Sequence, residues 1–103
     1  MRTALVSGAT SGIGRAAALA LGDAGWWVLA CGRDPERGAE VAAELARRAG
    51  GEFGAADLTD DGAAQRLVDR AVDATARLDL VVYSAGTHFR PRRRAPTPTT
   101  TTG

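Results

Sequence analysis

The chain has 103 residues, of which 45% are hydrophobic and 24% are charged, and its 13 basic and 12 acidic residues leave a net charge of +1. This balance predicts one small globular domain and excludes a strongly charged disordered protein. The single cysteine, Cys31, excludes a disulfide framework and a cysteine metal cluster, which favours a reducing, cytoplasmic location. The apolar runs are too short to span a membrane, and no signal-peptide pattern follows Met1.

The first predicted elements are a buried strand and an amphipathic helix. The apolar run Thr3–Ser7 predicts the strand, and the residues Gly12–Ala24 predict the helix after a short turn. Gly25 stands where a glycine is expected just past the end of a helix. The expected buried face of this helix consists of Ile13, Ala16, Ala17, Ala20, Leu21 and Ala24.

A second helix lies between two further strands. Trp27–Cys31 predicts the second strand, and Glu52–Ala55 predicts a weaker third strand. The helix is expected to begin at Asp34-Pro35, because an aspartate accepts the first N–H groups of a helix and proline suits its first turn. It is expected to end at Gly50-Gly51.

The third helix and the fourth strand complete the predicted domain. One of Thr59, Asp60 and Asp61 is expected to cap this helix. Asp79–Ser84 predicts the fourth strand. The apolar face of the helix is expected to consist of Ala64, Leu67, Val68, Ala71, Val72, Thr75 and Leu78.

The resulting βαβαβαβ order predicts an α/β fold with parallel strands and helices on both faces. Right-handed crossovers give the strand order 3-2-1-4, which is half of a doubly wound, Rossmann-like sheet. We therefore divide the chain into a partial dinucleotide-binding domain, residues 1–86, and a tail, residues 87–103. The tail is rich in Arg, Pro and Thr without apolar periodicity, so we expect it to be disordered.

A glycine-rich turn joins the first strand to the first helix. Gly8 suits a sharp turn, Gly12 lets a diphosphate approach the backbone, and Gly14 lets the helix pack against the strand. The helix end also offers N–H groups and its positive dipole to phosphates. A plain flexible turn is the alternative, but the strand–turn–helix context favours a dinucleotide site.

Three motifs in order carry a resemblance to a known family. Ser7-Gly8-Ala9-Thr10-Ser11-Gly12-Ile13-Gly14 resembles the T-G-x-x-x-G-x-G fingerprint of the short-chain dehydrogenase/reductase family, with Ser7 in place of Thr. Asp57-Leu58 resembles the pair that contacts adenine, and Ser84-Ala85-Gly86 resembles the N-A-G motif, with Ser84 in place of Asn. The resemblance covers Met1 to about Thr87. It implies cofactor contacts from Ser7, Gly8, Ser11, Gly12, Ile13, Gly14, Asp57, Leu58, Ser84, Ala85 and Gly86.

The end of the second strand bears on the choice of cofactor. NAD-dependent members of the family carry an acidic residue there for the ribose 2′-hydroxyl, whereas this chain has Gly32 followed by Arg33. Because Arg33 can pair with a 2′-phosphate, we expect NADP, with NAD as the alternative. Asp34 is a rival ribose ligand, 20 residues past Gly14, but a helix cap already explains its position.

The catalytic residues of the family have no counterpart in this sequence. The resemblance implies a Ser and a Y-x-x-x-K pair beyond a fifth strand, but the chain has no Lys and its only Tyr, Tyr83, lies on the predicted fourth strand. We assign no catalytic or metal-binding residue and expect the chain alone to be inactive. Two interpretations stay open: part of an NAD(P)-dependent alcohol or carbonyl oxidoreductase, or a dinucleotide-binding module without turnover.

Other partners have weaker support. Arg90 and Arg92–Arg94 lack interleaved aromatic residues and a nucleic-acid-binding fold, so nucleic-acid binding is disfavoured. The fourth strand would be an open sheet edge, through which copies of the chain could associate. We interpret the segment after about Thr87 as a frameshifted or misannotated end, and we expect no membrane partner.

Overall fold

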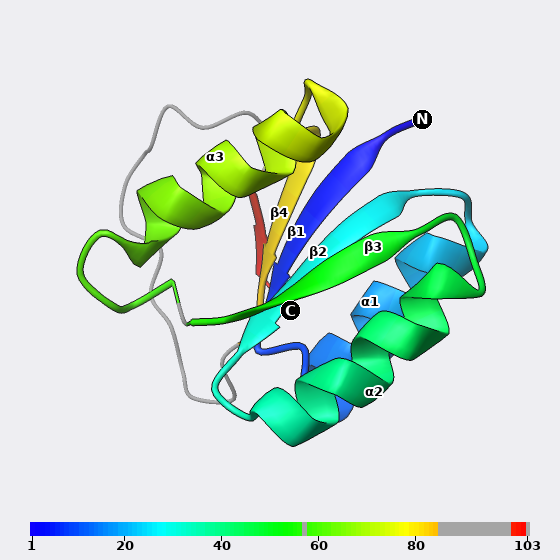
Figure 1. Ribbon diagram of the computed structural model, residues 1–103, viewed down its shortest axis with the longest axis horizontal. Helices are drawn as coiled ribbons and strands as arrows, with labels where there is room; N and C mark the ends of the chain where they lie inside the picture. Colours follow the sequence, from blue (N-terminus) through cyan, green and yellow to red (C-terminus); the bar gives the residue numbers. More distant parts are fainter. Residues whose placement is uncertain (57, 85–99, 103) are drawn as a thin grey trace.

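Figure 1 shows the computed structural model, in which helices cover both faces of one twisted sheet. The structure describes residues 1–56, 58–84 and 100–102. None of the helices in these ranges has the length and apolar character of a membrane span. The elements are β1 (Thr3–Ser7), α1 (Gly12–Asp23), β2 (Trp27–Gly32), α2 (Pro35–Ala46), β3 (Gly51–Ala55), α3 (Ala63–Thr75), β4 (Leu80–Tyr83) and β5 (Thr100–Thr102).

The sheet has the order β3-β2-β1-β4-β5, and all of its paired strands are parallel. The first four strands confirm the predicted α/β fold and the order 3-2-1-4. Thr100–Thr102 differ from the expectation of a disordered tail, because they pair with Val81–Tyr83 of β4. This pairing uses backbone N–H and C=O groups that an edge strand leaves unpaired, and threonine suits a strand. Over these residues β4 is therefore not the open edge that the sequence predicted.

Two cores lie on opposite faces of the sheet, because successive residues of a strand point to opposite sides. Val6, Val28 and Val41 belong to the core beneath α1 and α2. Leu5 and Leu29 belong to the core beneath α3. Each of these five side chains is fully buried.

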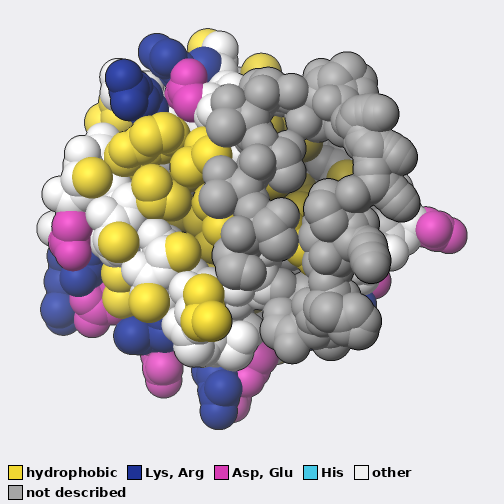
Figure 2. Space-filling view, turned by 180° about the vertical axis from the view of Figure 1, so that it is seen from behind, with side chains coloured by type: hydrophobic (Ala, Val, Ile, Leu, Met, Phe, Trp, Pro, Cys, Tyr) yellow, Lys and Arg dark blue, Asp and Glu magenta, His cyan; other side chains and the backbone are white. Residues whose placement is uncertain are grey.

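α1 packs through a face different from the predicted one. Its buried residues are Gly14, Ala18 and Gly22, about one per turn, whereas Ile13 is 69% exposed. A Cβ at Gly14 would overlap the Gly8 carbonyl. Because α1 lies this close to the sheet, its buried face consists of small residues rather than of its most apolar residues. Hydrophobic side chains accordingly gather at the surface on the rear face of the molecule (Figure 2). The exposed residues of the predicted face are Ile13, Ala16, Ala20 and Ala24.

α3 begins later than the sequence predicted. Its N-cap is Gly62, which has a φ of 72° and provides no side-chain cap. The expectation that Thr59, Asp60 or Asp61 caps the helix was therefore wrong. The buried residues of α3 are Ala63, Leu67 and Ala71. Ala64 and Val72, which were expected on the buried face, are exposed.

A hydrogen-bond network closes the amino end of the sheet. The Thr3 N–H donates to Asp79 Oδ2 (2.9 Å), and the Arg77 guanidinium lies 2.7 Å from Asp79 Oδ1. Hydrogen bonds from Arg77 and Thr3 hold the pKa of Asp79 below its usual range. The buried Thr3 hydroxyl donates to Thr75 Oγ1 (2.8 Å), and the Thr75 hydroxyl can donate to the Ala71 carbonyl (3.0 Å).

Candidate functional site

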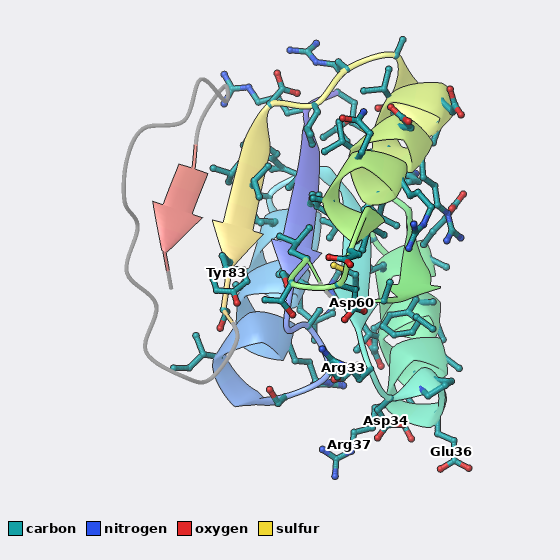
Figure 3. The ribbon with its side chains drawn as sticks, turned by 90° about the vertical axis from the view of Figure 1, so that its left-hand side faces the viewer. Arg33, Asp34, Glu36, Arg37, Asp60 and Tyr83 are labelled. Atoms are coloured by element: carbon teal, nitrogen blue, oxygen red, sulfur yellow. The ribbon has the colours of Figure 1, made fainter. Side chains whose placement is uncertain are left out.

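The candidate site lies at the carboxyl ends of the parallel strands, the edge at which open α/β sheets bind ligands (Figure 3). Nine of the residues expected to bind the cofactor lie in the described part: Ser7, Gly8, Ser11, Gly12, Ile13, Gly14, Arg33, Leu58 and Ser84. They occupy the ends of β1 and β4, the first turn of α1 and the segments that follow β2 and β3. Asp57, Ala85 and Gly86 lie outside the described residues.

The turn between β1 and α1 is held tightly against the sheet. Gly8 has a φ of 74°, which favours glycine because L side chains rarely adopt it. The N–H of the buried Ala9 donates to the Cys31 carbonyl at the end of β2 (3.0 Å). Gly14 lies over the Gly8 carbonyl with no space for a side chain. These contacts fix where α1 begins relative to the sheet edge.

The amino end of α1 faces an open surface. Ser11, its N-cap residue, has an extended backbone (φ −132°, ψ 152°) and makes no side-chain capping bond. Ser11, Gly12 and Ile13 are exposed, and among the described residues no atom outside the backbone of α1 lies within 4 Å of where a Cβ on Gly12 would be. The first backbone N–H groups of α1 therefore have room for an anion, which the helix dipole also attracts. This arrangement fits a diphosphate.

The two serines that replace family residues lie at the ends of neighbouring strands. The Ser84 N–H donates to the Ser7 carbonyl (3.2 Å), and both residues are buried. Ser7 is 1% exposed, and its Oγ has no hydrogen-bond partner among the described residues. The backbone, rather than either hydroxyl, thus joins the ends of β1 and β4 here.

Gly32, at the end of β2, has little space beside it. A Cβ at this position would lie 3.0 Å from Thr10 Oγ1 and 3.1 Å from Thr10 Cγ2. The Thr10 side chain therefore fills the space next to the position where the family resemblance puts the acid of NAD-dependent members. An acidic side chain at residue 32 would require Thr10 to move.

The Asp34 carboxylate caps α2, as the sequence predicted. Its Oδ1 accepts the N–H groups of Glu36 (3.0 Å) and Arg37 (3.2 Å), and its Oδ2 lies 3.5 Å from Arg37 Nε. Figure 3 shows these three residues together at the start of α2, below the end of the sheet. Both carboxylate oxygens of Asp34 thus have local partners, which weakens the case for a ribose ligand.

Arg33 reaches across the sheet edge to the segment after β3. Its Nη2 donates to Asp60 Oδ1 (3.1 Å) and lies 3.4 Å from Thr59 Oγ1. The side chains of Arg33 and Asp60 are 64% and 42% exposed, so water and an approaching anion can reach both. The sequence analysis missed this pair, because it assigned Thr59 and Asp60 to the helix cap. The only signal in the sequence was that Asp60 lies close along the chain to the Asp57-Leu58 motif.

Tyr83 and Cys31 are two further polar residues near this edge. Tyr83 ends β4 and is half-buried, and the chain has no Lys to accompany it. Cys31 is buried, and its thiol lies 3.4 Å from the Val6 carbonyl. Over residues 1–56, 58–84 and 100–102, no group of three His, Cys, Asp or Glu side chains is placed to hold a metal ion.

Comparisons with known proteins agree on one family. The model of the short chain dehydrogenase family matches residues 2–101. Sulfoacetaldehyde reductase 2 of Chromohalobacter salexigens is 40% identical over 88 residues, covering 85% of this chain and 35% of that protein. An alcohol dehydrogenase of the archaeon Thermococcus sibiricus, solved with 5-hydroxy-NADP, has a TM-score of 0.76 and 26% identity, covering 89% of this chain and 40% of that one.

A second solved structure combines higher identity with a nucleotide complex. RhlG of Pseudomonas aeruginosa, solved with NADP, is 40% identical with a TM-score of 0.71, covering 84% of this chain and 35% of that one. The chain therefore spans about a third of the length of the relatives that it matches.

Proposed function

Because this chain belongs to the short-chain dehydrogenase family, we propose that it is the adenosine-binding part of a dinucleotide site. The observation that carries the proposal is the exposed, uncapped amino end of α1 behind the tight Gly8 turn. In this proposal the diphosphate is bound by Ser7, Gly8, Ser11, Gly12, Ile13 and Gly14. Asp57 and Leu58 contact the adenine, and Ser84, Ala85 and Gly86 lie on the ribose side.

The proposed nucleotide is NADP rather than NAD. Three features support this choice: position 32 has no acid, Thr10 fills the space beside it, and the Asp34 carboxylate is used as a helix cap. Arg33 supplies an exposed guanidinium at the same edge, which suits a phosphate geometrically and electrically. NADP complexes of two similar structures add support from outside the chain.

The proposed activity of the whole protein is reduction of a carbonyl or oxidation of an alcohol. When bound, the nicotinamide supplies or accepts the hydride. The relatives include a sulfoacetaldehyde reductase and an alcohol dehydrogenase, which supports this reaction class. The alternative is a dinucleotide-binding module without turnover.

Titration of the purified chain with NADP and NAD tests the proposed ligand. We expect tighter binding of NADP, and we expect Arg33→Ala to lower NADP affinity by roughly tenfold or more, since a charge-assisted hydrogen bond contributes about 1.5–3 kcal/mol. Arg37→Ala is the matched control, because Arg37 is equally exposed (65%) but lies at the start of α2 beside Asp34. Equal affinities for both dinucleotides, unchanged in Arg33→Ala, would contradict the assignment.

Turnover measurements separate the two functional classes. We expect no hydride transfer by this chain on a panel of alcohols and ketones, because a positioned general acid or base contributes about 10²–10⁴-fold and we assign no such group to this chain. NADPH oxidation that scales with the concentration of purified chain would show that the assignment of no catalytic residue is wrong.

We also propose a cytoplasmic location and self-association through the edges of the sheet. The single buried cysteine supports a reducing, cytoplasmic environment. The outer strands of the described sheet are β3 and β5, and such edges can pair with another copy. Light scattering after size-exclusion chromatography tests this, with a concentration-dependent rise in mass as the expected result and a constant monomer mass as the contrary one.

A further inference from the structure

Arg33 has a partner before any nucleotide arrives. Its Nη2 lies 3.1 Å from Asp60 Oδ1, which is 27 residues away in the sequence, and the two residues follow the neighbouring strands β2 and β3. Both side chains are substantially exposed. An exposed ion pair of this kind is weak, since water and salt screen it. It can therefore open when a stronger anion competes for the guanidinium.

A 2′-phosphate is such an anion. It carries close to two negative charges near neutral pH and presents several acceptor oxygens, as other phosphate monoesters do. Arginine binds such a group with two parallel, charge-assisted hydrogen bonds, because its planar guanidinium matches the geometry of the phosphate oxygens. A 2′-hydroxyl offers neither the charge nor the geometry, so it leaves the Arg33–Asp60 pair closed.

We propose that Asp60 is a specificity-determining residue, which holds Arg33 across the sheet edge and competes with the 2′-phosphate of NADP for it. This inference rests on the proposed function. Asp60 lowers NADP affinity in two ways: the pair must open, and the freed carboxylate then lies close to the phosphate and repels it. NAD binding neither opens the pair nor brings a 2′-phosphate close to Asp60. Asp60 therefore reduces the preference for NADP over NAD that Arg33 creates. Thr59, 3.4 Å from the same Nη2, helps to keep the guanidinium over the segment after β3.

The test uses the whole chain and two kinds of probe. NADP and NAD are titrated by calorimetry into the wild type and Asp60→Asn, and adenosine 2′,5′-bisphosphate is titrated alongside as a probe of the adenosine half alone. Asp61→Asn is the matched control, because it removes the same charge from the adjacent exposed residue. Arg33→Ala and the double variant Arg33→Ala/Asp60→Asn complete the cycle.

We expect Asp60→Asn to tighten NADP and adenosine 2′,5′-bisphosphate binding by about fivefold, which is the scale of an exposed ion pair, and to leave NAD binding unchanged. Asp61→Asn should change little, and the gain from Asp60→Asn should be smaller when Arg33 is absent, because only the repulsion between the carboxylate and the phosphate is then removed. Thermal melts of each variant confirm that it is folded.

The outcomes separate the two proposals. If the wild type prefers NADP but Asp60→Asn binds it no more tightly than Asp61→Asn does, this inference is overturned and the proposed function stands. A gain in Asp60→Asn that is equally large without Arg33 also overturns it, because Asp60 would then act without competing for Arg33. If the wild type binds neither dinucleotide, the proposed function is wrong, and this inference is overturned with it. A separate reading comes from NMR of the Arg33 Nε–Hε group, which should shift on adding NADP to the wild type and not on adding NAD.

Discussion

At the amino end of the sheet, the Thr3 and Thr75 hydroxyls bond to each other, Thr75 also bonds to the Ala71 carbonyl, and the Asp79 carboxylate accepts the Thr3 N–H. At the carboxyl end, Ser11 gives the first N–H groups of α1 no side-chain cap, and Arg33 is paired with the exposed Asp60. The amino end is closed and internally satisfied, whereas the carboxyl end presents polar groups to solvent. Because of this difference, substitutions can be chosen that change either the stability of this small domain or its ligand binding.

Gly14→Ala should have the largest effect, because its Cβ would overlap the backbone of Gly8. We expect the free energy of unfolding to fall by about 3 kcal/mol, measured by urea denaturation. Gly12→Ala is the control, since in the described part of the chain no atom outside the helix backbone lies within 4 Å of the added Cβ. It should keep the stability and weaken NADP binding. Equal stability losses in both variants would contradict this division of roles at the carboxyl end.

Thr75→Val tests the closed amino end. It removes the acceptor of the buried Thr3 hydroxyl, and an unpaired buried donor costs about 2 kcal/mol of stability. Thr3→Val removes the buried group together with its bond and should cost only about 1 kcal/mol. Neither variant should alter NADP affinity. A change in NADP affinity without loss of stability would show that the two ends are not independent.

Asp34→Ala tests whether Asp34 contributes to stability as a helix cap or to nucleotide binding as a ribose ligand. Loss of the cap on the Glu36 and Arg37 N–H groups should lower the unfolding free energy by about 1 kcal/mol. The ratio of NADP to NAD affinity should stay the same. Asp34→Ser keeps a capping oxygen and should restore most of the stability. A selective loss of NAD affinity in Asp34→Ala would instead identify Asp34 as a ribose ligand.

The smallest expected effect is the pH dependence of Asp79, which is screened by solvent. Its pKa is lowered in the folded state by Arg77 and the Thr3 N–H, so the carboxylate stabilises the fold above its ordinary pKa. This stabilisation is lost as the pH falls through the folded-state pKa. In urea denaturation, the difference between wild type and Asp79→Asn should shrink below about pH 4. A constant difference down to pH 2 would show that the charge of Asp79 contributes nothing.

Local patterns in the sequence determined most of the fold. The run Thr3–Ser7 is the strand that its apolar residues predicted, and Asp34 caps α2 through the bonds that its position before Pro35 implied. Strand order followed from parallel strands and right-handed crossovers. The glycine-rich turn also lies at the carboxyl end of the sheet, as expected, because it directly follows β1. These features depend on neighbours in the chain, which is why the sequence alone determined them.

Tertiary contacts decided the rest. Apolar periodicity favoured Ile13 for the core, but the close approach of α1 to the Gly8 turn buries Gly14 instead, and a residue without a side chain gives no apolar signal. Asp60 was expected to cap α3, yet its carboxylate bonds Arg33 from 27 residues earlier in the chain. The composition of Thr100–Thr102 predicted no strand, whereas pairing with β4 makes one. In each case the deciding partner is distant in sequence, so only the folded chain brings it into contact.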